Sequence, residues 1–226
     1  LRRNLSTEAF AQQLDYRTDY WQVKAEALIV PHFHPGQLFQ QQLHFPKLSL
    51  RQLIAHDFND ERIPLRPQYK PMLPDQIIDT PIPFLIDTLD MTGAITYSAI
   101  APLTGDSSWI SFNAIQGRIF HLTNIPAHFS KELRLMATAR LYDQAPLEVD
   151  MQFQLNRSPS TFELSGTLQD LDMPILNPIL RGQTALSVSK GYSSRLLFNM
   201  AANDSLAVGE LLFRYKNLRI QLLDKE

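Results

Sequence analysis

Residues 147–156 read LEVDMQFQLN, and apolar and polar side chains alternate through them without a break. Successive side chains of a β-strand point to opposite faces of its sheet. One face of this strand is therefore wholly apolar and the other wholly polar. The apolar face can be covered by a second layer of protein or by a ligand that is not protein, and the residues alone leave both open.

The same alternation continues on either side of this strand. Residues 133–141 precede it across the turn sequence DQAP (143–146), and residues 162–168 follow it across NRSPST (156–161). Strands that recur about every ten residues with turns between them are typical of an antiparallel meander. We therefore predict a mostly β protein in which an antiparallel meander forms a curved, elongated sheet or open groove, with one or two short helices. The alternative is a β-sandwich, which alternation alone favours because antiparallel sheets usually bury one face on protein.

Prolines divide the chain. Six of them fall between residues 63 and 83, a density that excludes a long helix and a central strand. We expect N-terminal strands and turns in residues 1–62, a Pro-rich crossing segment in residues 63–83, and an antiparallel β-sheet body in residues 84–226.

Two interruptions are expected inside the body. Gly117 predicts a bulge between two strands. The sequence LDMPILNPILRG (171–182) predicts a short helix that Asp172 caps and Pro178 ends. Four strands should follow it, at residues 184–189, 194–202, 206–215 and 218–224.

The composition excludes several classes of protein. The formal net charge is -2 and the basic residues are scattered, which argues against a nucleic-acid partner. The chain has no cysteine, so disulfides, thiolate zinc sites and a cysteine nucleophile are excluded. It begins without methionine, and we expect it to be cut from a longer precursor, so that any signal peptide or membrane anchor would have been lost in that cut.

Few residues offer chemistry. His32 and His34 would share one face of a strand and could supply two metal ligands, but no third ligand stands at a recognisable spacing. Ser107 follows Gly-Asp, as in some esterases, yet it lies in an expected hairpin turn with no G-x-S-x-G motif. We predict no catalytic residue, no metal site and no cofactor.

Four carboxylates form two pairs, and the members of each pair are close in sequence. They are Asp87, Asp90, Glu148 and Asp150. Glu148 and Asp150 fall on the polar face of their strand. A solvated row of charges is a commoner arrangement than a general acid and base pair.

The apolar rows are the remaining feature. If the sheet stays open, they could line a groove for lipid chains, which need only continuous apolar surface. The lipid-groove candidates are Leu133, Leu135, Leu141, Val149, Met151, Phe153, Phe162, Leu164, Phe198, Met200, Leu211 and Phe213.

Four features in residues 164–226 carry a resemblance to a known family. They are the GTL strand (166–168), the LNP turn (176–178), a strand after Gly191, and GELLFRYKNL (209–218). Together they resemble a segment of the AsmA-like family of bacterial envelope proteins, in the long form of Bacteroidetes-type bacteria. Upstream, IDTLDMTGAITYSAIAP and ISFNAIQGRIFHLTN resemble another recurring hairpin pair of that family.

The resemblance implies a function. Members of the family are anchored at the inner membrane and extend into the periplasm as elongated, taco-like sheets with an apolar groove. They are implicated in moving phospholipid between membranes or in outer-membrane assembly. This implies a non-enzymatic periplasmic module whose partner is phospholipid or another acyl-chain lipid. The alternatives are a structural or adhesive β-sandwich with a closed core and, third, an esterase that uses Ser107.

Overall fold

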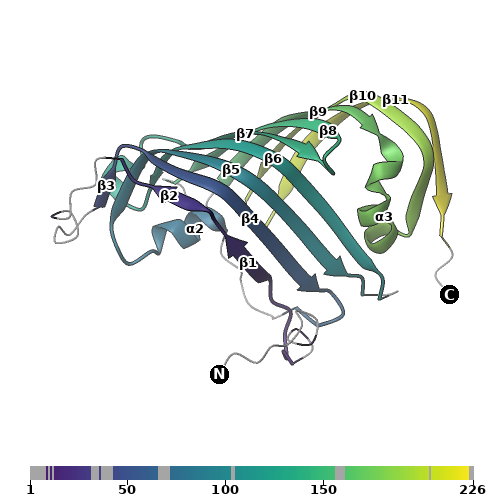
Figure 1. The fold of residues 1–226 in the computed structure, drawn as a ribbon, viewed down its shortest axis with the longest axis horizontal. Helices are drawn as coiled ribbons and strands as arrows, with labels where there is room; N and C mark the ends of the chain where they lie inside the picture. The colour runs from purple at the N-terminus through teal and green to yellow at the C-terminus, as the bar shows by residue number, and fades with distance from the viewer. Residues whose placement is uncertain are drawn as a thin grey trace.

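The computed structural model describes residues 9, 11, 13–31, 36, 43–65, 72–102, 105–155, 161–203 and 205–223. Every strand of these residues belongs to one sheet of eleven strands (Figure 1). The strands are β1 (Tyr20–Lys24), β2 (Ala27–Ile29), β3 (Leu43–Phe45), β4 (Leu48–Asp60), β5 (Phe84–Ile100), β6 (Ser107–Thr123), β7 (Leu133–Leu141), β8 (Ala145–Gln154), β9 (Thr161–Asp172), β10 (Leu186–Ala202) and β11 (Ala207–Leu222). The helices are α2 (Leu73–Ile78) and α3 (Asn177–Thr184), with 3-10 turns η2 (Pro126–His128) and η3 (Met173–Leu176).

The sheet is an open meander. From β5 to β11 each strand pairs antiparallel with the next along the chain. The predicted mostly β, antiparallel, curved sheet is confirmed, and the described strands form no second sheet that would make a sandwich. No helix of the described residues is both long enough and apolar enough to cross a bilayer.

The N-terminal strands join the same sheet. β1 and β2 pair antiparallel with β4, while β4 and β3 run parallel to β5. A parallel pair needs a long crossover connection. Residues 61–83 form this connection and include α2, whose Pro74 stands in the first turn, where a missing N–H costs nothing.

The strands are longer than expected because bulges bend them without ending them. β5, β6 and β10 each have 17 residues. In β6 the register shifts between Asn113 and Gln116, and Ala114 takes a φ of 50°. A bulge is therefore present, but it lies at Ala114, three residues before the predicted position at Gly117. Gly117 pairs regularly with Met91 and Ala137, and a Cβ there would lie 2.8 Å from the Met91 Cγ.

Two long strands replace the four predicted at the C-terminus. β10 and β11 pair along their whole length, with register shifts between Val188 and Arg195. These shifts explain why the apolar alternation breaks there although the strands continue.

The helix predicted at residues 171–182 is two helices. Pro178 stands in the first turn of α3 and begins that helix, so the expectation that it ends one is wrong. The α-helix stops at Ala185, which takes a left-handed φ of 56°. Asp172 precedes η3 without a side-chain capping bond. Instead Asn177 fastens α3 to β10, since its Nδ2 donates to the Val188 carbonyl and its Oδ1 accepts from the Val188 N–H (2.9 and 2.7 Å).

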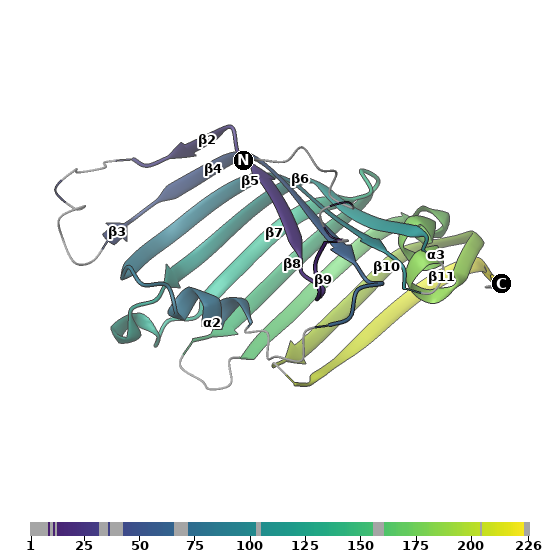
Figure 2. The same ribbon diagram turned by 90° about the horizontal axis from the view of Figure 1, so that it is seen from below.

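Both helices lie under the arch of the sheet, at opposite ends of the long axis (Figures 1 and 2). β9, β10 and β11 bend over α3. The apolar side chains of the sheet point to this inner side, so we call it the concave face. The other, polar side is called the outer face.

One glycine is required where the parallel strands meet. A Cβ on Gly93 would lie 1.9 Å from the backbone oxygen of Leu53 on β4. We expect Gly93→Ala to lower the free energy of unfolding by about 2 kcal/mol or more, because the two backbones must separate. Urea unfolding measures this. Thr138→Ala, an exposed change within β7, should stay within about 0.5 kcal/mol of the wild type; an equally small effect at Gly93 would contradict the strand pairing.

Candidate functional site

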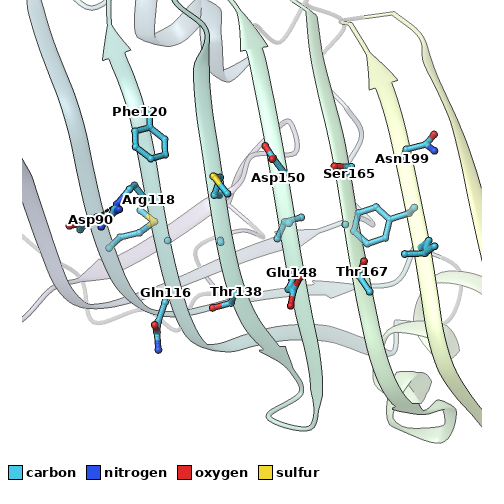
Figure 3. A pocket seen from close by; sticks show the side chains of 18 of the residues that line it. Asp90, Gln116, Arg118, Phe120, Thr138, Glu148, Asp150, Ser165, Thr167 and Asn199 are labelled. Carbon is cyan, nitrogen blue, oxygen red and sulfur yellow. Dashed lines mark hydrogen bonds and ion pairs between the residues drawn. The ribbon is translucent and has the colours of Figure 1, made fainter.

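A hollow with a volume of about 1050 Å³ lies on the outer face. A strongly twisted sheet has saddle curvature, so each face can be hollow in one direction. Figure 3 shows side chains of β5 to β10 that line it. They include the polar residues Gln116, Thr138, Ser165, Thr167 and Asn199.

Ion pairs occupy the charged part of this hollow. Asp90 accepts from the Arg118 Nε (2.5 Å) and lies 2.8 Å from the Lys47 Nζ. Asp150 accepts two hydrogen bonds from the guanidinium group of Arg134 on the neighbouring strand, one to each carboxylate oxygen. The hydrogen bonds from these arginines hold the pKa of both carboxyls below the ordinary value. Both are therefore ionised at neutral pH and fixed as ion pairs.

The other sequence candidates are placed separately. Asp87 pairs with His44 across β3 and β5 (2.8 Å), and Glu148 is exposed. Ser107 is an exposed residue at the start of β6. His32 and His34 lie outside the described residues. Among the residues that are described, no three histidine, aspartate or glutamate side chains gather as they would around a metal ion.

The twelve lipid-groove candidates all fall on the concave face. The strand register places them side by side in rows that cross the sheet. One row contains Leu89, Ile119, Leu135, Met151, Leu164 and Met200, from β5 to β10. The next contains Met91, Gly117, Ala137, Val149, Gly166, Phe198 and Leu211.

The second row contains glycines whose missing side chains leave room for larger neighbours. A Cβ on Gly166 would lie 2.3 Å from the Phe198 Cζ, so the Phe198 ring lies over this glycine. Met91 lies over Gly117 in the same way on the other side of the row. An aromatic ring and a flexible thioether thus form the surface there, and both are apolar.

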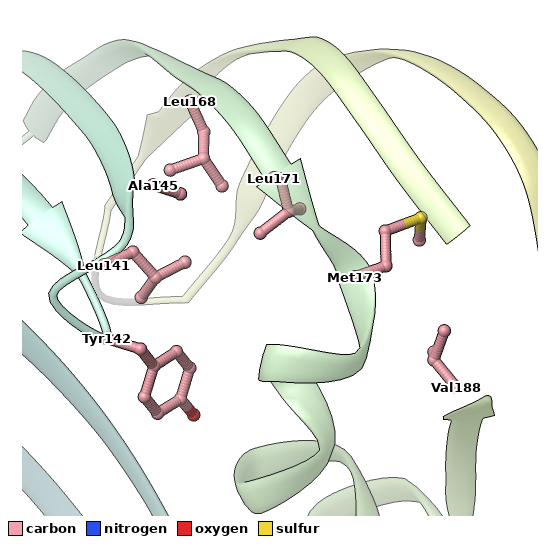
Figure 4. Packing of buried hydrophobic residues seen from close by; sticks show 7 residues of the cluster. All are labelled: Leu141, Tyr142, Ala145, Leu168, Leu171, Met173 and Val188. Atoms are coloured by element: carbon pink, nitrogen blue, oxygen red, sulfur yellow. The ribbon is translucent and has the colours of Figure 1, made fainter. Parts of the chain in front are cut away.

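One end of the concave face is covered by α3. Figure 4 shows Leu141, Leu168 and Leu171 beneath the arching strands. Ile175, Leu176 and Leu180 of η3 and α3 pack against this cluster, as does Phe213. Leu141 is accordingly buried.

The other end is covered near α2. Leu133, Phe153 and Leu155 form a buried cluster, and Ile77 and Ile78 of α2 pack against it. Phe162 and Met151 pack there too, and the Phe153 and Phe162 ring centroids are 5.7 Å apart. Three candidates, Leu133, Leu141 and Phe153, are therefore part of the protein core.

The helices are too short to cover what lies between them. A strand of 17 residues extends about 55 Å at 3.3 Å per residue, whereas α3, with 8 residues, is about 12 Å long. Leu135, Leu164 and Met200 are only half-buried, and Leu211 on the edge strand is 64% exposed. We call the part of the concave face between the two buried clusters the apolar strip. It comprises Leu89, Met91, Ile119, Leu135, Val149, Leu164, Phe198, Met200 and Leu211, of which Ile119 also packs against the cluster near α2.

Sequence reasoning missed three residues of this strip. Leu89, Met91 and Ile119 lie on β5 and β6, where the bulge near Ala114 shifts the alternation. On β6, the alternation of apolar and polar residues that includes Ile119 does not continue in phase across the bulge. The alternation around Ile119 would have identified the apolar face of this part of β6. It would not have identified Leu89 and Leu135, which lie opposite Ile119 on the neighbouring strands.

Two tyrosines at the α3 end of the face stay neutral. Burial raises the pKa of Tyr142 to about 12, and its hydroxyl donates to the Trp109 carbonyl (2.5 Å). Burial, together with the nearby Glu61 carboxylate, raises the pKa of Tyr97 to about 12 as well. Neither phenol places a charge on the concave face at physiological pH.

Comparison with known proteins returns no relative. No protein-family model, no curated protein and no solved structure matches this chain.

The Arg134–Asp150 pair should respond to acid in a defined way. Because the folded-state pKa of Asp150 is lowered, its contribution to stability is complete above the ordinary carboxyl pKa and is lost as the pH falls through the folded-state value. We expect Asp150→Asn to cost less than about 1 kcal/mol at pH 7, since the pair is partly exposed. The urea midpoints of the variant and the wild type should converge as the pH falls through the folded-state pKa of Asp150. Glu148→Gln, which changes an exposed carboxylate of the same strand, is the control; a constant difference at all pH values would contradict the ion pair.

Proposed function

We propose that this protein is a non-enzymatic lipid-binding module whose apolar strip holds the acyl chains of phospholipid or a similar lipid. The observation that carries the proposal is a continuous apolar surface across seven strands, β5 to β11, that the two helices leave uncovered. A face of this kind is costly in water, and a ligand made of methylene groups is the simplest cover for it.

The energetics suit reversible binding. Each buried methylene contributes roughly 0.8 kcal/mol, so ten of them contribute roughly 8 kcal/mol before the cost of association. An acyl chain lying on an open face buries only part of its surface. Such a ligand can bind and leave, which a carrier or a conducting surface requires.

The resemblance to the AsmA-like family supports a more specific version. In that version the chain is a segment of the β-rich periplasmic body of an envelope protein, anchored at the inner membrane in its full length. The apolar strip would take part in lipid transfer and outer-membrane biogenesis. The open, elongated single sheet is the shape that this version requires.

Lipid binding can be tested with matched methionines. Met200 lies on the apolar strip, whereas Met136 is exposed on the outer face. We expect the wild type to retain phospholipid in native mass spectrometry and to bind a fluorescent fatty acid. Met200→Asp should weaken this binding at least about tenfold, because a carboxylate would face the hydrocarbon chain. Met136→Asp should leave it unchanged.

A second variant guards against loss of folding. Leu164→Trp fills the strip without adding charge and should displace lipid while the urea midpoint stays close to that of the wild type. A wild-type protein that takes up no lipid would contradict the proposal, as would equal losses in Met200→Asp and Met136→Asp.

A further inference from the structure

The terminal hairpin of the sheet carries a concentration of positive charge. Five of the 21 Lys and Arg residues of the chain lie on β10 and β11, and all five are exposed. We call them the basic strip; they are Lys190, Arg195, Arg214, Lys216 and Arg219.

The register sets like charges against each other. Arg195 is directly opposite Arg214, and Lys190 is directly opposite Arg219. Like charges in directly opposite positions destabilise a strand pair. The basic strip therefore weakens the hairpin that bears it, which is unexpected unless another molecule supplies the negative charge.

Two arginines in the middle of the sheet have acidic partners. Arg118 and Arg134 each have an aspartate on the neighbouring strand. Within the described part of the chain, no residue of the basic strip has an ion-pair partner. The chain as a whole has a net charge of -2, so this excess is local.

Exposed apolar and aromatic side chains accompany the charges. Tyr192 is directly opposite Lys216, and Tyr215 immediately precedes Lys216 on β11. Ile220 and Leu222 are also exposed, Leu222 to 84%. Cations mixed with tyrosine and aliphatic side chains are characteristic of surfaces that lie at the interface of a lipid bilayer.

We propose that the basic strip docks this edge of the sheet onto an anionic lipid bilayer. The cations would contact phosphate groups, and the neighbouring apolar side chains would enter the interface. The same strand carries Leu211, the end of the apolar strip, so docking would bring the lipid-binding face to the membrane. The choice of a bilayer over an acidic protein rests on the proposed function.

Vesicle co-sedimentation tests this docking. We expect the wild type to bind vesicles of phosphatidylcholine with about 30% phosphatidylglycerol, and not vesicles of phosphatidylcholine alone. Raising the salt concentration from about 0.05 to 0.5 M should release the protein, because exposed charges are screened. The double variant Arg214→Glu/Arg219→Glu should bind at least about tenfold more weakly.

The control changes the same charge at the opposite edge of the sheet. Lys24→Glu/Arg51→Glu alters exposed residues of β1 and β4 and should leave vesicle binding unchanged. Urea midpoints must show that both double variants remain folded. Equal binding to neutral vesicles, or equal losses in the two double variants, would overturn the proposal. Binding to polyglutamate without binding to vesicles would also overturn it and would assign the strip to an acidic protein.

Fatty-acid uptake separates this inference from the proposed function. Arg214→Glu/Arg219→Glu should still take up fatty acid in solution, since the apolar strip is unchanged. A wild type that binds anionic vesicles but takes up no fatty acid would refute the lipid-binding function while leaving the docking surface in place.

Discussion

The structure depends on a mismatch between one long sheet and two short helices. Strands of 17 residues present an apolar face that two helices of 6 and 8 residues can cover only at its ends. Packing against α2 and α3 provides two of the hydrophobic cores. The middle of the face has no layer of protein over it among the described residues. Because exposed apolar surface is unfavourable in water, we infer that a lipid covers this part of the face.

The two faces of the sheet differ in the ionisation of their polar side chains. On the outer face, Asp90 and Asp150 are held in ion pairs with arginines, which lower their pKa values. On the concave face, Tyr97 and Tyr142 have pKa values raised to about 12 and stay uncharged. The basic strip of β10 and β11 departs from this pattern, because its charges are opposed by like charges. That departure is what separates an edge suited to docking from the rest of the sheet.

The sequence predicts the middle of the sheet well and its margins poorly. Between residues 133 and 168 the alternation is regular, and strands, turns and the apolar face follow from it directly. At Ala114 and between Val188 and Arg195, bulges shift the register, so alternation there predicts breaks that the strands do not have. The parallel pairing of β4 with β5 depends on a distant crossover, which local pattern does not encode. Whether an apolar face is open depends on the size of its cover, and this emerges only when all the elements are assembled.

The central claim is that acyl chains occupy the concave face and not the outer one. Methionines report on both sides of the sheet, since Met200 lies on the apolar strip and Met136 on the outer face. The most direct measurement is NMR of 13C-methyl methionine with a lysophospholipid that carries a spin label on its acyl chain. We expect strong broadening of the Met200 methyl signal, with the Met136 signal spared. Broadening of Met136 alone, or no difference between the two faces, would contradict it.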